Sequence, residues 1–150
     1  MRQNDVIPEA TQTAKKQLAA GDISGAERLL SQQLQRTPQD RETHYYYCVC
    51  LRYLTRLSDA QGELETLLSR FPRFARGYQE LGYTFKALND QDKALSSFRT
   101  AVTLNDALLG SWRALVELTS VTYRPTIYEE AVTQTQNLEG LPKALLQVRD

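Results

Sequence analysis

Apolar residues recur along this chain at helical spacing, and sustained two-residue alternation typical of a strand is almost absent. Three segments show the helical pattern most clearly: 25–36 (GAERLLSQQLQR), 59–70 (DAQGELETLLSR) and 92–102 (DKALSSFRTAV). Capping residues stand where such helices should begin, namely Asp22, Ser58, and either Asn89 or Asp90. The pattern therefore predicts an all-α chain of short amphipathic helices.

The pattern also repeats every 34 residues. Ala26, Ala60 and Ala94 form a column of small residues, which suits positions where two helices approach closely. The other columns are Leu30, Leu64 and Phe98; His44, Tyr78 and Trp112; Ala14, Cys48, Gly82 and Val116; and Pro38, Pro72 and Asp106. Such a period predicts helix pairs stacked on their neighbours, because a single pair cannot bury its apolar face.

These columns resemble the tetratricopeptide repeat (TPR), whose pattern is W-x2-L-G-x2-Y followed by Ala, an aromatic residue or Leu, Ala and Pro. The third unit matches best, through Tyr78, Leu81, Gly82, Phe85, Ala94, Phe98 and Ala101. The resemblance implies an all-α helix-turn-helix solenoid, a right-handed superhelix of about three to four repeats plus a C-terminal helix. We expect one domain over residues 1–150, with repeats near 7–40, 41–74 and 75–108, a divergent repeat at 109–140, and a further or capping helix starting at 141–150.

Composition and charge narrow the classes of function. Hydrophobic residues make up 41% and charged residues 24% of the 150 residues, as in an ordinary globular domain. The formal net charge is zero, which argues against general binding of nucleic acid. No run of about 18 apolar residues is present and the N-terminal segment lacks the apolar stretch of a secretory signal, so we expect a cytoplasmic protein without a membrane span.

The stretch HYYYCVCLRYL, residues 44–54, holds the only His and both Cys of the chain. His44 and Cys48 share a helix face, as two metal ligands would. A structural zinc site takes four ligands, however, whereas the repeat gives His44 a bulky packing position and Cys48 a small one. We expect core packing here; a metal ion or a His-assisted Cys nucleophile are the less favoured alternatives. Because no phosphate-binding loop or G-x-S-x-G motif occurs, we expect no catalytic residue, no cofactor and no enzyme activity.

In the TPR arrangement the first helix of each pair lines the concave surface. The resemblance then implies a groove formed by Tyr45, Val49, Arg52, Arg76, Gln79, Tyr83, Lys86 and Arg113. Glu42 and Glu117 also occupy groove-facing positions, and the first unit contributes Thr11 and Lys15. Tyr and Arg commonly anchor interfaces, so we predict recognition of a peptide or a partner protein, and an acidic peptide would suit the basic residues. The alternative is that these tyrosines only pack and these cations are only solvated.

Some TPR domains hold a terminal carboxylate in a two-carboxylate clamp of Lys, Asn, Asn, Lys and Arg. The positions that match this clamp are Thr11, Lys15, Tyr46, Arg76 and Glu80. Both Asn are missing and Glu80 replaces a cation, so we do not expect a chaperone-tail clamp.

The end of the chain diverges from the repeat. We expect a second helix of the last pair from about Ile127 to Leu138. The phrases ELGYTFKAL, GSWRAL and GLPKALLQVRD are similar to the N-terminal TPR region of bacterial TPR-containing sulfotransferases. That resemblance implies an alternative function, as a substrate-docking or accessory region of a larger transferase whose catalytic domain lies outside these residues. Self-association through exposed apolar faces of the terminal units is a third alternative.

Overall fold

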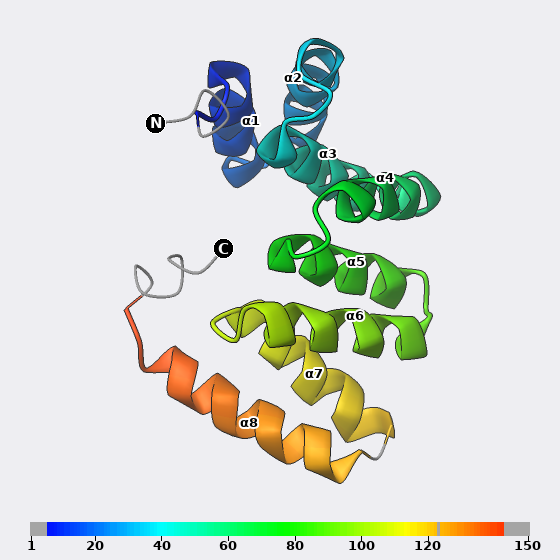
Figure 1. The fold of residues 1–150 in the computed structure, drawn as a ribbon, viewed down its shortest axis with the longest axis vertical. Coiled ribbons are helices and arrows are strands. Elements are labelled where there is room, and N and C mark those ends of the chain that lie inside the picture. Colours follow the sequence, from blue (N-terminus) through cyan, green and yellow to red (C-terminus); the bar gives the residue numbers. More distant parts are fainter. Residues whose placement is uncertain (1–5, 123, 143–150) are drawn as a thin grey trace. The chain divides into compact units, whose positions relative to one another are not determined.

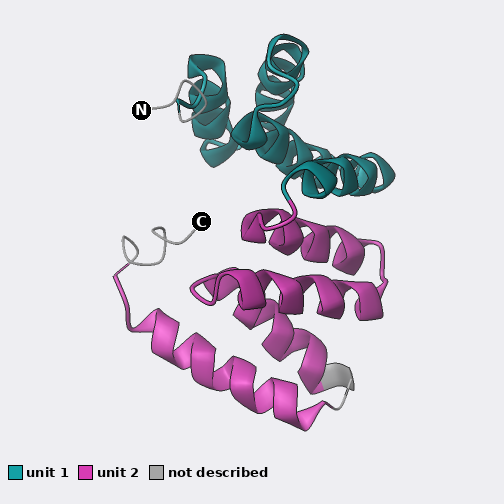
Figure 2. Cartoon of the chain, in the orientation of Figure 1, with its two compact units in different colours: residues 1–71 teal, residues 72–150 magenta. Residues whose placement is uncertain are grey.

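The computed structural model describes residues 6–122 and 124–142, which form eight α-helices and no strand (Figure 1). The expected all-α fold class is thereby confirmed. The chain divides into two compact units, residues 1–71 and residues 72–150 (Figure 2). The division into repeats given above remains a prediction.

The first unit holds four helices, which are α1 (Glu9–Ala19), α2 (Ile23–Arg36), α3 (Arg41–Tyr53) and α4 (Leu57–Arg70). Each helix packs on the next one, and α1 also contacts α3. Ala14, Ala26, Leu30 and Cys50 are fully buried together, with Tyr46 and Tyr47 packed against them. Small residues from α1, α2 and α3 therefore meet at one core. Ala14 and Ala26 belong to the predicted columns of small residues, whereas Cys50 does not.

The second unit also holds four helices, which are α5 (Ala75–Ala87), α6 (Gln91–Leu104), α7 (Leu109–Thr122) and α8 (Pro125–Glu139). Consecutive helices again pack on each other, and α5 also contacts α7. A Cβ atom added at Gly82 would lie 2.7 Å from the ring of the fully buried Phe98. Only a residue without a side chain lets α5 approach α6 this closely.

The turns within the helix pairs keep the 34-residue period. Residues with positive φ occur at Gly21 (88°), Thr55 (58°) and Asn89 (61°). At each turn the next amide N–H reaches back to a carbonyl of the preceding helix: Asp22 to Gln17, Arg56 to Leu51, and Asp90 to Phe85. This hydrogen bond is that of a Schellman motif, so the turn geometry is preserved even where the glycine is replaced.

The helix caps agree with the sequence at two of three positions. Asp22 and Asp90 accept hydrogen bonds from the amides of Gly25 and Lys93, as predicted for N-caps. The prediction of Ser58 as a cap is wrong, because α4 begins at Leu57 after the N-cap residue Arg56, which makes no side-chain cap. The Schellman turn places the helix start one residue before Ser58, so its hydroxyl lies inside the first turn.

The last described helix starts earlier than expected. It begins at Pro125 rather than near Ile127, and it ends at Glu139 rather than Leu138. Proline suits the first turn of a helix because its missing N–H would have no intrahelical partner there. Pro125 lies 34 residues after Gln91, the start of α6, so the helix period continues after the sequence motif has faded. The helix expected from 141 falls largely on residues 143–150, which lie outside the described residues.

Candidate functional site

In the second unit, α5 and α7 contribute neighbouring stripes of side chains to one face. Gln79, Tyr83 and Lys86 lie at helical spacing on α5, and each is partly exposed. Gly110, Arg113 and Glu117 form the matching stripe on α7. We call these six residues the α5/α7 face.

Two close contacts join the stripes at this face. The Ser111 hydroxyl, which is fully buried, donates a hydrogen bond of 2.8 Å to Gln79 Oε1. A Cβ atom added at Gly110 would lie 2.5 Å from the Tyr83 hydroxyl oxygen and 3.1 Å from Gln79 Oε1. The bare backbone of Gly110 is therefore what leaves room for the tips of both side chains.

The aromatic ring of Tyr83 packs against the core of the second unit. It meets the ring of Phe98 edge to face, with centroids 5.2 Å apart and an interplanar angle of 71°. This T-shaped arrangement is favourable for aromatic pairs. Tyr83 thus presents its hydroxyl end to the α5/α7 face while its ring is fixed by the core of the unit.

The cations of the α5/α7 face are paired with carboxylates. Lys86 Nζ lies 2.5 Å from Glu117 Oε2. The Arg113 Nε and Nη2 groups both donate to Glu139 Oε1, at 3.3 Å and 3.0 Å. All four side chains are at least one-third exposed, so these pairs stabilise the fold by little. They nevertheless leave this part of the surface without a net charge.

Arg76, the fourth predicted residue of α5, lies at the start of that helix. Its guanidinium carbon is 5.0 Å from the centroid of the Phe74 ring, a cation–π geometry. Phe74 is buried and precedes the helix as its N-cap residue. Arg76 therefore covers the helix start as well as carrying a charge.

Tyr45 and Val49, two of the predicted groove residues of the first unit, are less accessible. Tyr45 and Val49 are each only 9% exposed on α3, and the ring of Tyr45 meets that of Tyr46 edge to face at 5.0 Å. Arg52 is partly exposed and stacks over the ring of Tyr53 at 4.6 Å. Lys15 on α1 is exposed, and its Nζ lies 5.7 Å from the centroid of the Tyr46 ring. Within this unit, Lys15 and Arg52 are thus the predicted groove residues that offer the most surface.

Two of the positions compared with the carboxylate clamp are inside the protein. Thr11, expected to face the groove, has no exposed surface; its hydroxyl lies 2.7 Å from the Thr43 hydroxyl between α1 and α3. Glu80 is 3% exposed on α5. The expected groove position of Thr11 is therefore wrong, because its short side chain is covered where the two helices meet.

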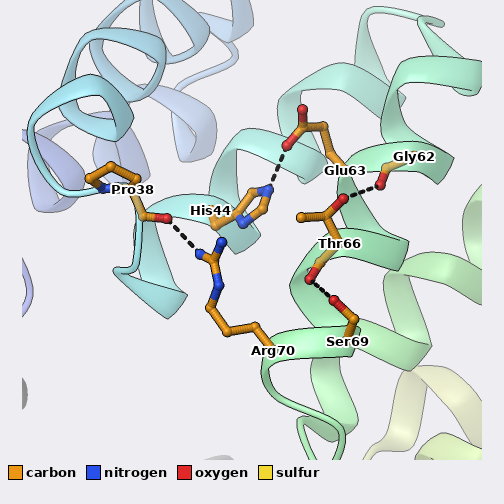
Figure 3. Close-up of polar contacts among 7 residues, drawn as sticks. All are labelled: Pro38, His44, Gly62, Glu63, Thr66, Ser69 and Arg70. Carbon is orange, nitrogen blue, oxygen red and sulfur yellow. Dashed lines mark hydrogen bonds and ion pairs between the residues drawn. The ribbon is translucent and has the colours of Figure 1, made fainter.

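The structure shows whether His44 and the two cysteines pack in the core or form a metal site. Cys48 and Cys50 are both fully buried, which agrees with the packing role expected for Cys48. The His44 ring, 5% exposed, donates through Nε2 to Glu63 Oε2 on α4 at 2.6 Å (Figure 3). Within residues 6–122 and 124–142, no three or more His, Cys, Asp or Glu side chains are grouped as a metal ion would require.

A shallow pocket of about 360 Å³ opens beside this histidine in the first unit. Figure 3 shows the imidazole between Glu63 and Arg70, whose Nη1 donates to the carbonyl of Pro38 at 2.7 Å. Both interactions attach α4 to α3 and to the loop before α3. No sequence pattern indicates this pair of contacts, because Glu63 and Arg70 occupy ordinary solvated positions of an amphipathic helix.

Tyr47 lines the same pocket one helical turn after His44. The pKa of the Tyr47 hydroxyl is raised above its ordinary value. The main cause is the partial burial of the side chain, and the second is the negative charge of Glu27. The hydroxyl therefore stays protonated at neutral pH, as a packing tyrosine with a polar end.

Sequence reasoning missed Gly110 and Ser111 as parts of the α5/α7 face. Ser111 lies two repeat periods after Thr43, which makes the corresponding contact to α1. A comparison of hydroxyl residues across the periods would have found it. The close approach at Gly110 has no such signal, because it depends on the separation of two helices.

None of the helices described in residues 6–122 and 124–142 has the length and apolarity that crossing a bilayer requires. This agrees with the absence of a long apolar run in the sequence.

The comparisons with known proteins point to one fold. Residues 17–81 match the family model described as tetratricopeptide repeat. TTC0263, a thermophilic TPR protein of Thermus thermophilus, is similar at 22% identity, with 89% of this chain and 75% of that chain covered and a TM-score of 0.78. MamA from Desulfovibrio magneticus RS-1, residues 41 to the end, is also 22% identical, covering 91% and 77% of the two chains with a TM-score of 0.74.

A third solved structure, the first TPR of Spaghetti (RPAP3) bound to the HSP90 peptide SRMEEVD, is 11% identical. The match covers 76% of this chain and 90% of that chain, with a TM-score of 0.70. No curated protein matches the sequence. The resemblance to sulfotransferases thus has no support beyond the short phrases that suggested it. Residues 17–81 are thus similar to the tetratricopeptide repeat, and the chain has the all-helical fold of TPR proteins.

Proposed function

We propose that this chain is a protein-recognition module, without catalytic activity of its own, that binds a peptide or a partner protein on the exposed faces of the first helices of its pairs. The observation that supports this most directly is the α5/α7 face. There Gln79 and Tyr83, one amide and one aromatic hydroxyl, are fixed by Ser111, Gly110 and Phe98 rather than free to rotate. A surface that is ordered before binding loses little entropy when a partner arrives.

The fold agrees with such a role. TPR-type folds generally mediate protein–protein interaction, and the similar first TPR of Spaghetti is bound to a peptide. We propose that the partner is likewise a peptide or a surface segment of a protein, and that the module works as a scaffold in the cytoplasm. No nucleic acid, membrane or cofactor is part of this proposal. Tyr45, Val49, Arg52, Arg76, Lys86 and Arg113 remain predicted contact residues.

The test is selection of binders from a displayed library of random peptides against the immobilised chain, followed by titration of synthesised binders by fluorescence anisotropy. We expect Tyr83→Ala to weaken binding of peptides that use the α5/α7 face by about fivefold or more, because a partly exposed aromatic anchor is lost. Arg52→Ala tests the α3 surface of the first unit separately. Arg99→Ala is the matched control, since Arg99 is exposed on α6. Library selection that yields no specific binder would refute the proposal.

The peptide SRMEEVD serves as a second probe. We expect no measurable binding, because Thr11 and Glu80 are buried at two of the positions where a carboxylate clamp needs polar or basic side chains. Binding of this peptide with an affinity that Lys15→Ala lowers would show that a clamp is present after all.

The two alternative functions have separate tests. A catalytic domain encoded after residue 150, with a phosphate-binding loop, would support an accessory role in a transferase. Light scattering at low and high protein concentration would reveal self-association. No contact within the described residues supports either alternative.

A further inference from the structure

The sequence suggests an acidic partner, but the charges on the α5/α7 face do not favour one. Two of the basic residues expected to attract such a partner are Lys86 and Arg113. In the structure both are paired within the unit, Lys86 with Glu117 and Arg113 with Glu139. Each cation is thus already matched by one carboxylate of the same chain.

A partner's carboxylate would gain little from these cations. To bind Lys86 it must displace Glu117, which exchanges one exposed ion pair for another. Glu117 would then remain close by as a like charge, which opposes the incoming carboxylate. The same reasoning holds for Arg113 and Glu139. The ion pairs therefore discriminate against acidic segments rather than select for them.

Beside the two ion pairs, the face offers neutral hydrogen bonding. Because Gln79 Oε1 accepts from Ser111, the amide nitrogen of Gln79 is turned away from that bond, and no described residue accepts a hydrogen bond from it. A side-chain amide carries two N–H donors. They suit the carbonyl oxygens of an extended peptide backbone or of a neutral polar side chain.

Gly110 sets the position of this donor group. A methyl group there would lie 3.1 Å from Gln79 Oε1 and 2.5 Å from the Tyr83 hydroxyl. The tips of both side chains would have to move. Gly110 is therefore a positioning residue for the face and not part of the core.

We propose that the α5/α7 face binds an extended peptide segment that is uncharged where it crosses this face, read through the amide of Gln79 with Gly110 holding Gln79 and Tyr83 in place. This rests on the proposed function, since it specifies the partner of the same surface. Arg76, one helical turn before Gln79 on α5, lies at the end of this face, where its guanidinium stacks on the Phe74 ring.

The experiment uses the full chain and peptides selected from the random library, chosen because Tyr83→Ala weakens their binding. We expect these peptides to lack an excess of Asp and Glu. We also expect their dissociation constants to change by less than about twofold between about 50 mM and about 500 mM NaCl, because no net charge is neutralised on binding. Acidic peptides whose affinity falls about tenfold or more over this range would overturn the inference and leave the proposed function standing.

Variants separate the neutral contacts from the ion pairs. Gln79→Ala and Gly110→Ala should each weaken binding by about fivefold, since a buried interfacial hydrogen bond is lost or displaced. Lys86→Gln combined with Glu117→Gln should change the affinity by less than about twofold, because the pair is exposed and is not replaced by the peptide. Circular dichroism of every variant checks that helicity is retained. A loss of binding in the Lys86/Glu117 variant with none in Gln79→Ala would refute the inference.

Discussion

The same two repeat positions join the first helices of neighbouring pairs in both units, but they use different side chains. In the first unit the contact is between the hydroxyls of Thr11 and Thr43, 2.7 Å apart and fully buried. In the second unit, two repeat periods later, Gln79 and Ser111 make it at 2.8 Å, and Gln79 is partly exposed. One contact closes the space between its helices, whereas the other leaves an amide group on the surface.

The difference shows how a repeat position can keep its contact in the fold while part of its side chain stays exposed. A short Thr reaches only its neighbour, so its polar atom is used up inside the unit. A longer Gln reaches the same neighbour with its oxygen and still has its nitrogen for a partner. The repeat fixes where the contact lies, and the length of the side chain decides whether any of it remains available.

The largest effect is expected from breaking the second unit itself. Gly82→Leu should lower the free energy of unfolding by about 1–3 kcal/mol or more, because even a Cβ atom would lie 2.7 Å from the Phe98 ring. Gly62→Ala is the matched control on α4, where an added Cβ meets no atom within 4 Å. It should stabilise the protein by about 0.5–1 kcal/mol through helix propensity. Urea unfolding measures both changes, and an unaltered stability of Gly82→Leu would contradict the close packing of α5 on α6.

The next largest effect on stability is expected at the two hydroxyl contacts, which can be compared directly. Thr43→Val should cost about 1–3 kcal/mol, because it leaves the buried Thr11 hydroxyl without its partner and removes the bond to Asp40. Ser111→Ala should cost only about 0.5–1.5 kcal/mol, since water can satisfy the partly exposed Gln79. Equal costs in urea unfolding would show that the two contacts do not differ in this way.

A smaller effect on stability is expected when Gln79 is replaced by Thr, the residue that the first unit has at the equivalent position. Gln79→Thr keeps a hydroxyl near Ser111, so stability should change by less than about 1 kcal/mol. Binding of peptides selected on the α5/α7 face should nevertheless fall by about fivefold, because the amide donors are gone. Titration of the selected peptides with the purified variant measures this, and undiminished binding would mean that position 79 is structural in both units.

The smallest effect concerns pH in the first unit. The pKa of Tyr47 is raised mainly by burial, so the folded protein keeps the proton to a higher pH than the unfolded chain does. The unfolded state then binds fewer protons, and stability falls as pH rises above about 10, the ordinary pKa of tyrosine. Tyr47→Phe should flatten this decline. Thermal melts of both proteins from about pH 9 to about pH 11 would reveal it, and parallel declines would contradict it.

Much of the fold was predictable from the sequence, because local interactions determine it. Apolar spacing and the caps Asp22 and Asp90 locate helices through interactions within a few residues. Ser58 failed as a cap because the preceding turn, with Thr55 at positive φ, sets the N-cap of α4 at Arg56, two residues earlier. The start of α8 at Pro125 was missed for a similar reason, since the repeat continues in the backbone after its signature residues end.

The candidate surface was predictable only in part. Helical periodicity places Gln79, Tyr83 and Lys86 on one stripe, and in the structure all three lie on α5 and are partly exposed. Whether a stripe residue is exposed depends on what the neighbouring helix places against it, and this is how Thr11 was misassigned and Tyr45 came to be covered. Pairing of Lys86 with Glu117, 31 residues away, likewise needs the distance between two helices.

The sequence by itself determined the all-α class, the 34-residue period and the small residues at which helices meet, because these follow from side-chain size and local hydrogen bonding. The tertiary structure alone decided which polar atoms are used inside the protein and which remain for a partner. That choice depends on separations of a few ångströms between side chains some 30 residues apart, such as Ser111 and Gln79, and no periodicity encodes them.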